Sequence, residues 1–293
     1  MTAEPYVRSA TVMGTIATIE VVVADSAGPA VDTAFEWFRQ IETCCSRFDA
    51  GSELSQLSSK IGTAVPVSAI LYEAVQFAIA VADETGGAFD PTVGFRMETA
   101  GFNREYRTGL PMHAAFDADD SVSYRDVLLD PVQKTITLLK PMVLDLGAVA
   151  KGLAVDMAAR ELLPFRNFAI DAGGDLYLGG CNSEGRAWSV GIRHPRVEGE
   201  LIDSIRVSNQ AVCTSGDYER GDHILDPRGG HAARNTASVT VVAQTAMLAD
   251  ALATAAFVLG PAEGIQMLER AGVEGLIITP SLERFETQGM RHG

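Results

Sequence analysis

The sequence predicts an α+β fold, in which strands and helices mix along the chain without strict alternation. Stretches rich in β-branched residues, which are typical of strands, occur between stretches with the apolar spacing of a helix. No segment matches the Gly-rich fingerprint of a dinucleotide-binding βαβ unit or of a phosphate-binding loop. We find no internal repeat, low-complexity tract or linker in the 293 residues. Length alone allows one large domain or two intimately packed ones.

The N-terminal half is expected to form a hairpin, two helices and a loop. Gly14 is the one break in a β-branched stretch. Ser68 is a candidate N-cap, and Gly86-Gly87 would stop the helix that it starts. The expected elements are a strand or hairpin at 11–23, a helix from 31 to 48 that ends near 49–51, a helix from 68 to 82, and a surface loop at 101–120.

The C-terminal half is expected to combine short strands with two helices. β-Branched and aromatic enrichment predicts the strands, and apolar residues at helical spacing predict the helices. The expected strands are 135–139, 168–170, 188–192, 205–207, 238–242 and 276–279, and the expected helices are 148–163 and 248–259.

Charge and composition exclude some classes of function. The formal net charge of −15 argues against a nucleic-acid partner, because most of the surface would repel a phosphate backbone. The four cysteines form no C-x-x-C pair or even framework, which indicates neither a zinc site nor a disulfide scaffold. No signal segment, lipid-anchor cysteine or apolar run of roughly 18 to 20 residues is present. We expect a soluble, cytoplasmic protein with reduced thiols and no membrane insertion.

Two segments combine glycine with an acidic residue beside a helix. In residues 86–94, Asp90-Pro91 follows two glycines, which indicates a helix cap and a turn, or a rigid edge whose Asp90 binds the exocyclic amine of a nucleobase. In residues 144–152, Asp145 precedes a helix start and Lys151 lies one turn in. The acid can simply complement the helix dipole. Alternatively, free N–H groups at the helix start and Lys151 can bind a diphosphate.

Two further segments place small residues near chain reversals. Gly173-Gly174 follows a strand, where glycine allows close approach of a ligand or forms a bulge or turn. We interpret residues 214–216 as a Thr-Ser-Gly turn, followed by His223 and an Asp226-Pro227 turn. A lone histidine is more often structural than catalytic, yet this setting makes His223 the best general acid/base candidate among the five histidines.

A fifth segment carries an acid and a hydroxyl at helical spacing. Asp250 and Thr254 are four residues apart, so a helix places them on one face. A carboxylate and a hydroxyl are hard oxygen ligands that suit Mg²⁺. The alternative is a first-turn aspartate and a threonine that bonds back to the carbonyl four residues earlier.

Taken in order, these segments resemble the FAD:protein FMN transferase (ApbE) family. The resemblance extends from Met13 to Gly260, which is most of the chain. It rests on the ordered motifs Met13-Gly14-Thr15, Ser46-Arg47-Phe48 with Ser52-Glu53-Leu54-Ser55, Ala88-Phe89-Asp90-Pro91-Thr92, Asp145-Leu146-Gly147 with Lys151-Gly152, Ala172-Gly173-Gly174-Asp175, Thr214-Ser215-Gly216, His223 to Pro227, and Asp250 to Thr254.

The resemblance implies one ApbE-type catalytic domain over 1–293, with mixed sheets flanked by helices in two intimately packed lobes and FAD in the cleft between them. The residues implied to line the FAD pocket are Met13, Phe48, Ala88, Phe89, Asp90, Asp145, Lys151 and Leu225. The implied Mg²⁺ ligands are Asp250, Thr254 and the backbone carbonyl of Ala148.

The chain departs from the family pattern at a few positions. Phe48 stands where members often carry tyrosine, which keeps the ring and loses a hydroxyl. Ala253 stands where some members carry a second carboxylate, which argues against a two-metal site. Arg228-Gly229-Gly230 replaces the usual threonine-glycine, and the loop between Tyr218 and His223 is short.

The resemblance also implies a reaction. FAD is the substrate, AMP leaves, and FMN becomes attached through a phosphoester to a Ser or Thr of an acceptor flavoprotein. Mg²⁺ would neutralise charge on the diphosphate, and His223 would take the acceptor's proton. Two alternatives share the same motifs: a Mg²⁺-dependent FAD pyrophosphatase that gives FMN and AMP, and a flavin-binding carrier without catalysis.

Overall fold

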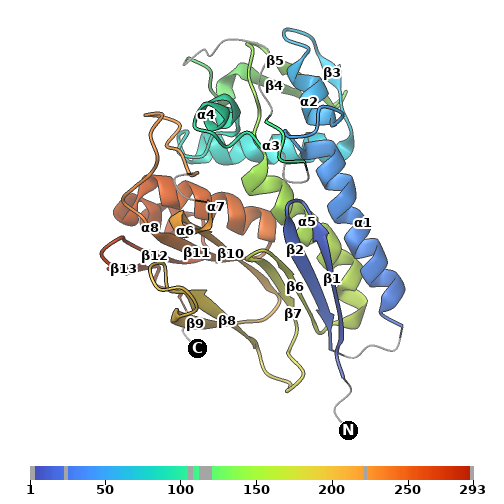
Figure 1. Cartoon of the computed structure of the whole chain (residues 1–293), viewed down its shortest axis with the longest axis vertical. Helices are drawn as coiled ribbons and strands as arrows, with labels where there is room; N and C mark the ends of the chain where they lie inside the picture. Colours follow the sequence, from blue (N-terminus) through green and yellow to red (C-terminus); the bar gives the residue numbers. More distant parts are fainter. Residues whose placement is uncertain (1–3, 23–25, 105–107, 112–120, 221–222, 291–293) are drawn as a thin grey trace.

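The computed structural model describes residues 4–22, 26–104, 108–111, 121–220 and 223–290. An eight-stranded sheet with the order β1-β2-β6-β7-β10-β11-β12-β13 is antiparallel at every pair of neighbours. A second group of elements, with α2, α3, α4 and a three-stranded sheet of order β3-β5-β4, lies above it in Figure 1. Helices and strands therefore mix as predicted for an α+β fold.

The strands of the large sheet are β1 (Tyr6–Val12), β2 (Thr15–Val21), β6 (Phe168–Ala172), β7 (Asp175–Gly179), β10 (Gln210–Gly216), β11 (Ser238–Ala243), β12 (Glu274–Ile278) and β13 (Arg284–Glu286). The small sheets contain β3 (Val65–Pro66), β4 (Val127–Asp130) and β5 (Thr135–Leu138), and the hairpin of β8 (Trp188–Arg193) with β9 (Leu201–Val207).

The helices are α1 (Gly28–Cys45), α2 (Glu53–Ser58), α3 (Ala69–Glu84), α4 (Gly94–Thr99), α5 (Gly147–Leu162), α6 (Asp217–Arg220), α7 (Ala246–Leu259) and α8 (Pro261–Arg270). Three 3₁₀ turns are η1 (Pro91–Val93), η2 (Tyr124–Asp126) and η3 (Leu163–Phe165). None of the helices within the described ranges is long and apolar enough to cross a membrane.

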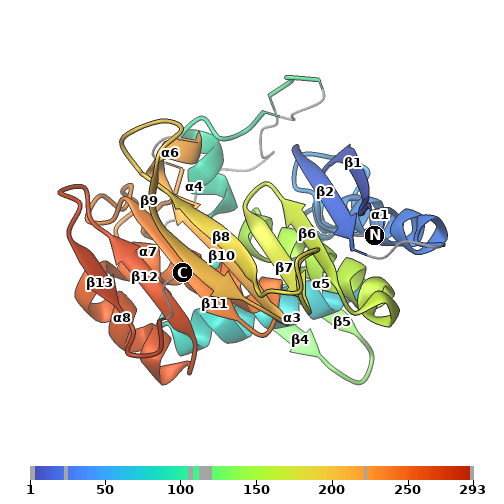
Figure 2. The same cartoon turned by 90° about the horizontal axis from the view of Figure 1, so that it is seen from below.

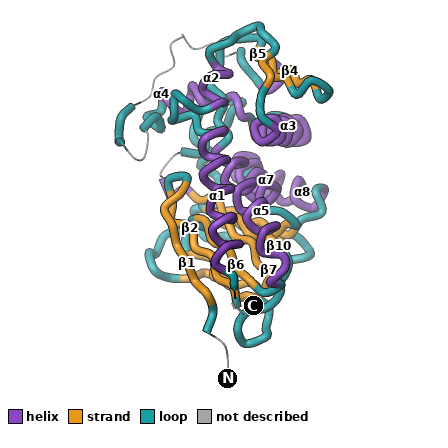
Figure 3. The backbone as a smooth tube through the Cα atoms, turned by 90° about the vertical axis from the view of Figure 1, so that its right-hand side faces the viewer, coloured by secondary structure: helices purple, strands orange, loops and turns teal. Residues whose placement is uncertain are grey.

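The two faces of the large sheet are covered differently. Helices α1, α5, α7 and α8 pack on one face, and α1 continues from the upper helices down beside the sheet, as Figure 3 shows. The β8–β9 hairpin covers the other face, which Figure 2 shows from below. Residues such as Ile192 and Ile205 of the hairpin pack there against Val212 of β10 in a small second core. The middle of the large sheet is thus covered on both faces, whereas the edge strands β1 and β13 stay largely exposed.

Local sequence explains the helix starts. The hydroxyl of Ser68 accepts the Leu71 N–H, so the predicted N-cap of α3 is confirmed. Thr245 caps α7 in the same way. At Gly152 of α5, a Cβ atom would lie 2.5 Å from the Met247 Cα, so only glycine lets α5 and α7 approach this closely.

Several sequence expectations were wrong. Residues 214–216 form no turn: they are the end of β10, where Thr214 and Ser215 pair with Thr240 and Val239 of β11. Helix α1 ends at Cys45 rather than near residues 49–51, because Ser46 is already extended. The strands and helices that were not predicted are β3, β4, β7, β10, β13, α2, α4, α6 and α8. Of the expected loop at 101–120, residues 105–107 and 112–120 lie outside the described part.

Candidate active site

One pocket of about 600 Å³ is lined by residues of the upper elements and of helices α5 and α7. Every predicted site residue lines it: Met13, Phe48, Ala88, Phe89, Asp90, Asp145, Ala148, Lys151, His223, Leu225, Asp250 and Thr254. These residues come from six separate segments of the chain. The structure therefore brings the predicted residues together, while the role of each stays a prediction.

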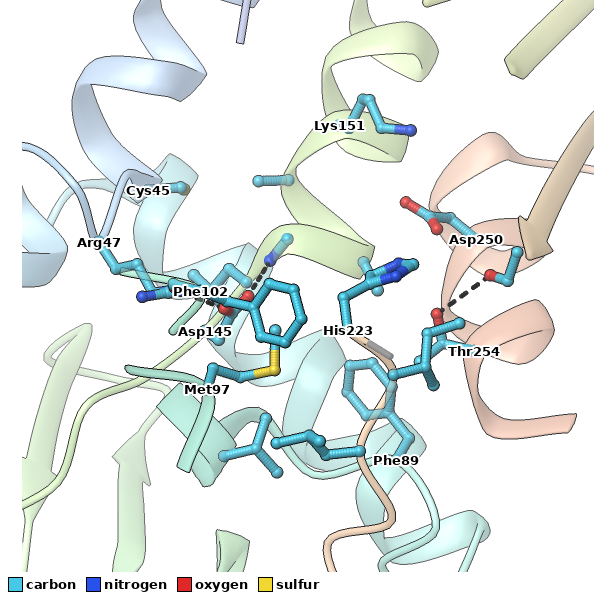
Figure 4. Close-up of a pocket in the computed structure, with 18 of the residues that line it drawn as sticks. Cys45, Arg47, Phe89, Met97, Phe102, Asp145, Lys151, His223, Asp250 and Thr254 are labelled. Atoms are coloured by element: carbon cyan, nitrogen blue, oxygen red, sulfur yellow. Dashed lines mark hydrogen bonds and ion pairs between the residues drawn. The ribbon is translucent and has the colours of Figure 1, made fainter. Parts of the chain in front are cut away.

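Helices α5 and α7 carry the charged side of the pocket. Asp250 and Thr254 lie one turn apart on α7, and both line the pocket opposite Lys151 of α5 (Figure 4). The Asp250 residue is only 7% exposed. The hydroxyl of Thr254 lies 3.4 Å from that of Ser215 on β10. This face thus presents a carboxylate, hydroxyls and an ammonium to the cavity.

A buried aspartate fixes α5 against α7. The carboxylate of Asp156 on α5 accepts the N–H groups of Ala246 and Met247 over 2.7 and 3.0 Å, at the first turn of α7. Burial raises the pKa of Asp156 to about 6, although these two hydrogen bonds act in the opposite direction. The contact sets the spacing of the two helices that carry Lys151 and Asp250.

The pocket offers hard oxygen donors to a metal ion. Asp250 supplies a carboxylate and Thr254 a hydroxyl, and Ala148 has non-helical backbone angles (φ −90°, ψ 17°) at the start of α5. Oxygen donors of these kinds suit Mg²⁺, which retains waters and recruits phosphate oxygens. Among the described residues, no group of three or more His, Cys, Asp or Glu side chains could hold a metal ion, so the donor set depends on the hydroxyl and backbone oxygens. With that composition the residues fit a magnesium ion.

The opposite rim is organised by Arg47, which the sequence analysis had not placed in the site. Its Nε donates to Asp145 over 2.6 Å and its Nη2 donates to the Phe102 carbonyl over 2.5 Å. The guanidinium carbon also lies 4.0 Å from the centre of the Phe48 ring. One buried cation therefore orients two predicted pocket residues.

Three of the N–H groups at the start of α5 are engaged within the chain. Asp145 accepts the Gly147 N–H over 2.7 Å. The amides of Val149 and Ala150 both donate to the Leu146 carbonyl. The amides of Gly147, Val149 and Ala150 are therefore not the free diphosphate ligands that the sequence suggested, because the turn before the helix uses them. Lys151 remains as the positive group that this segment contributes to the pocket.

Asp90 closes a turn at the wall of the pocket. Its Oδ1 accepts the Thr92 N–H over 2.9 Å and the Thr92 hydroxyl over 2.8 Å, and its Oδ2 accepts the Tyr124 N–H over 3.1 Å. Burial raises the pKa of Asp90 despite these bonds. The interpretation as a cap and turn is confirmed, and the contact with a nucleobase stays a prediction.

Two other predicted positions lie at turns or aromatic contacts. Met13 has a positive φ of 49° in the β1–β2 turn, and its N–H donates to Glu42 over 3.3 Å. His223 lies edge-on to Phe102, with ring centres 6.3 Å apart, and both line the pocket (Figure 4). The imidazole therefore faces the cavity beside an apolar ring.

Behind the pocket lies an acid that the sequence analysis had quoted but not assigned. Asp175 begins β7 directly after the Gly173-Gly174 turn, is 2% exposed, and forms an ion pair with Lys151. At Gly173 the φ is +67° and a Cβ would lie 2.3 Å from the Thr15 hydroxyl oxygen, so the two glycines form a tight turn. Sequence reasoning missed Arg47 and Asp175 because their ion-pair partners are distant in the sequence. Each is a charged residue directly next to a predicted motif, and this adjacency is the signal that could have found them.

Comparisons with known proteins identify the family and the fold of the chain. The family model described as the ApbE family matches residues 13–277. A relative from Haemophilus influenzae, named FAD:protein FMN transferase, is 31% identical over 271 residues, which are 85% of this chain and 78% of the relative. The crystal structure of the ApbE protein from Thermotoga maritima has a TM-score of 0.87 at 31% identity over 97% of both chains. The flavin transferase ApbE from Vibrio cholerae has a TM-score of 0.85 at 25% identity over 98% of both chains. The chain therefore belongs to the ApbE family, as its ordered motifs predicted, and has that family's α+β fold.

Proposed function

We propose that this protein is a Mg²⁺-dependent FAD:protein FMN transferase, which releases AMP and attaches FMN through a phosphoester to a Ser or Thr of an acceptor flavoprotein. The observation that carries the proposal is the meeting of Lys151, Asp250, Thr254 and His223 in one pocket of a chain that belongs to the ApbE family. Several curated relatives, including those from Haemophilus influenzae and Treponema pallidum, are named FAD:protein FMN transferase.

The pocket suits a large, partly aromatic dianion in a chain of net charge −15. Phe48 and Phe89 offer ring surface, and the Arg47 guanidinium behind Phe48 fixes one of these rings. Lys151 provides positive charge where the diphosphate would lie. Asp250, Thr254 and the Ala148 carbonyl would hold Mg²⁺, which when bound neutralises negative charge on the diphosphate.

Different residues of the chain act at different steps of the reaction. His223 takes the proton of the acceptor hydroxyl, whose oxygen then forms a bond to the phosphorus of the FMN half. The bond between this phosphorus and the oxygen bridging to AMP breaks, and AMP leaves with that oxygen. Lys151 balances part of the charge that this oxygen gains. Phe102, edge-on to His223, gives the imidazole an apolar neighbour.

A transfer assay tests the proposal. The protein is incubated with FAD, Mg²⁺ and a candidate acceptor flavoprotein, and a variant of that acceptor with alanine at its Ser or Thr is the matched control. We expect flavin that survives denaturation on the first acceptor only, with AMP formed in equal amount. AMP and free FMN in the absence of any acceptor would identify a pyrophosphatase instead. If FAD binds and no AMP is released, the protein would be a flavin-binding carrier without catalysis.

A further inference from the structure

The ammonium of Lys151 is shared by two carboxylates on different elements. Asp175 of β7 forms an ion pair with it, and Asp250 of α7 adds further attraction. Burial alone would lower the pKa of Lys151, but the charge of Asp175 and then that of Asp250 raise it overall. Lys151 and Asp250 line the pocket, whereas Asp175 is not among the residues that line it.

The backbone holds Asp175 rigidly. Its Cα is paired with Ala172 of β6 and with Cys213 of β10, so the residue lies between two neighbours in the middle of the large sheet. The tight Gly173-Gly174 turn precedes it. A carboxylate fixed in this way can determine where a flexible lysine side chain ends.

We propose that Asp175 is a positioning residue that retains the Lys151 ammonium on the β7 side and thereby keeps it from competing with a divalent cation for the Asp250 carboxylate. This inference rests on the proposed function for its assignment of Asp250 as a metal ligand. Without Asp175, the remaining carboxylate that attracts Lys151 is Asp250. The ammonium would then bind Asp250 and compete with the metal ion, because opposite charges in a poorly solvated pocket attract strongly.

The same arrangement keeps the local charge favourable for a cation. One ammonium and two carboxylates give this cluster one net negative charge. The ion pair with Asp175 compensates the positive charge of Lys151, so the negative charge of Asp250 is not neutralised by this lysine. Lys151 can therefore serve an anionic substrate on one side while Asp250 serves a metal ion on the other.

The test measures metal binding directly. Mn²⁺ is titrated into the whole protein and the free ion is followed by electron paramagnetic resonance, without FAD and without turnover. The proteins are the wild type, Asp175→Asn, Lys151→Met and the double variant. Asp171→Asn is the matched control, because Asp171 lies on the other side of the Gly173-Gly174 turn, is exposed and accepts the Gly174 N–H.

We expect Asp175→Asn to weaken Mn²⁺ binding at least tenfold and Asp171→Asn to change it less than threefold. In the Lys151→Met background the competing ammonium is absent, so adding Asp175→Asn should change the dissociation constant less than threefold. Wild-type affinity in Asp175→Asn would overturn the proposal. An equal loss in both backgrounds would also overturn it, because it would indicate a simple charge effect or direct ligation.

Folding is checked by circular dichroism and melting temperature. If Asp175→Asn is not folded, Asp175→Ser, which is smaller and also neutral, carries the same expectation. The double variant removes a buried ion pair as a unit, which is usually tolerated; loss of Mn²⁺ binding in a folded double variant would by itself overturn the proposal. The failure of the proposed function would differ: wild-type protein would bind Mn²⁺ normally and release no AMP from FAD.

Discussion

The Nε of Arg47 donates to the carboxylate of Asp145 across 2.6 Å, and this contact joins the segment after α1 to the turn before α5. The two residues are 98 positions apart in the sequence. The Arg47 side chain is 5% exposed and that of Asp145 18%. The ion pair is therefore largely shielded from water, and removing one partner leaves the other charge without compensation.

We expect Arg47→Met to lower the free energy of unfolding by about 3 kcal/mol, since breaking a buried ion pair typically costs about that much. The variant should also bind FAD more weakly, because the Phe48 ring and the Asp145 turn lose their common support. Urea unfolding and flavin fluorescence titration measure the two effects. Arg39→Met is the control: Arg39 pairs with Glu36 on the surface, and its loss should change stability by less than about 0.5 kcal/mol. Equal effects in the two variants would contradict this.

The Asp156 carboxylate predicts a pH dependence of stability. Its pKa is raised from the ordinary value of 3.8 to about 6 in the folded protein, chiefly by burial. Between these values the folded state binds a proton that the unfolded state has lost. The contribution of this group is therefore full below about pH 4, falls as the pH rises towards 6, and is constant above that.

Comparison with Asp156→Asn isolates this contribution. The wild type should lose about 3 kcal/mol relative to the variant between pH 4 and pH 7, following from the shift in pKa. The variant should be less stable at every pH in absolute terms, because its amide places an NH2 donor where one of the two Asp156 oxygens accepts the Ala246 or Met247 N–H. Urea unfolding curves at four pH values measure the difference. Parallel pH profiles would show that Asp156 does not titrate in this range.

The metal assignment predicts a specific loss in Asp250→Ala. The variant should release no AMP from FAD at any Mg²⁺ concentration while its circular dichroism spectrum matches the wild type. Removing divalent ions with EDTA should bring the wild type down to the level of the variant and leave the variant unchanged. Turnover in Asp250→Ala that still responds to Mg²⁺ would remove Asp250 from the ligand set.

The sequence could predict contacts that repeat within one element. Asp250 and Thr254 share a face because the helix repeats every 3.6 residues, and Ser68 caps α3 through a bond three residues away. Pairings across the chain could not be read in this way. Lys151 forms an ion pair with Asp175 because β7 lies between β6 and β10 in the sheet. Sequence spacing alone does not reveal this strand order.

The error at residues 214–216 has a related cause. Thr-Ser-Gly has the composition of a turn, yet β11 pairs with this segment in register and buries Ser215 and Gly216. Sheet context thus outweighed local preference. The consequence for the site is direct: as part of a strand, Ser215 places its hydroxyl 3.4 Å from that of Thr254, next to the predicted metal ligands.

The last prediction separates base catalysis from metal catalysis at His223. A Ser or Thr hydroxyl is a poor nucleophile at neutral pH, so a positioned base typically contributes about 10²- to 10⁴-fold. FAD binding should depend instead on the other pocket residues and on Mg²⁺. We therefore expect His223→Ala to retain FAD affinity within about tenfold and to lose flavin transfer by about 10²-fold or more.

The competing explanation is that Mg²⁺ alone activates the hydroxyl and that His223 stabilises the neighbouring Asp226-Pro227 turn. The structure already closes this turn through Asp226, which accepts the Arg228 N–H and both Nε and Nη2 of its guanidinium over 2.9 to 3.0 Å. His223 instead packs its ring near Phe102 on the pocket wall. Arg228→Ala is thus the matched control, which should lower the melting temperature and keep flavin transfer. His223→Ala should keep the melting temperature and lose flavin transfer. Near-normal transfer in His223→Ala, with a lowered melting temperature, would exclude the imidazole as the base.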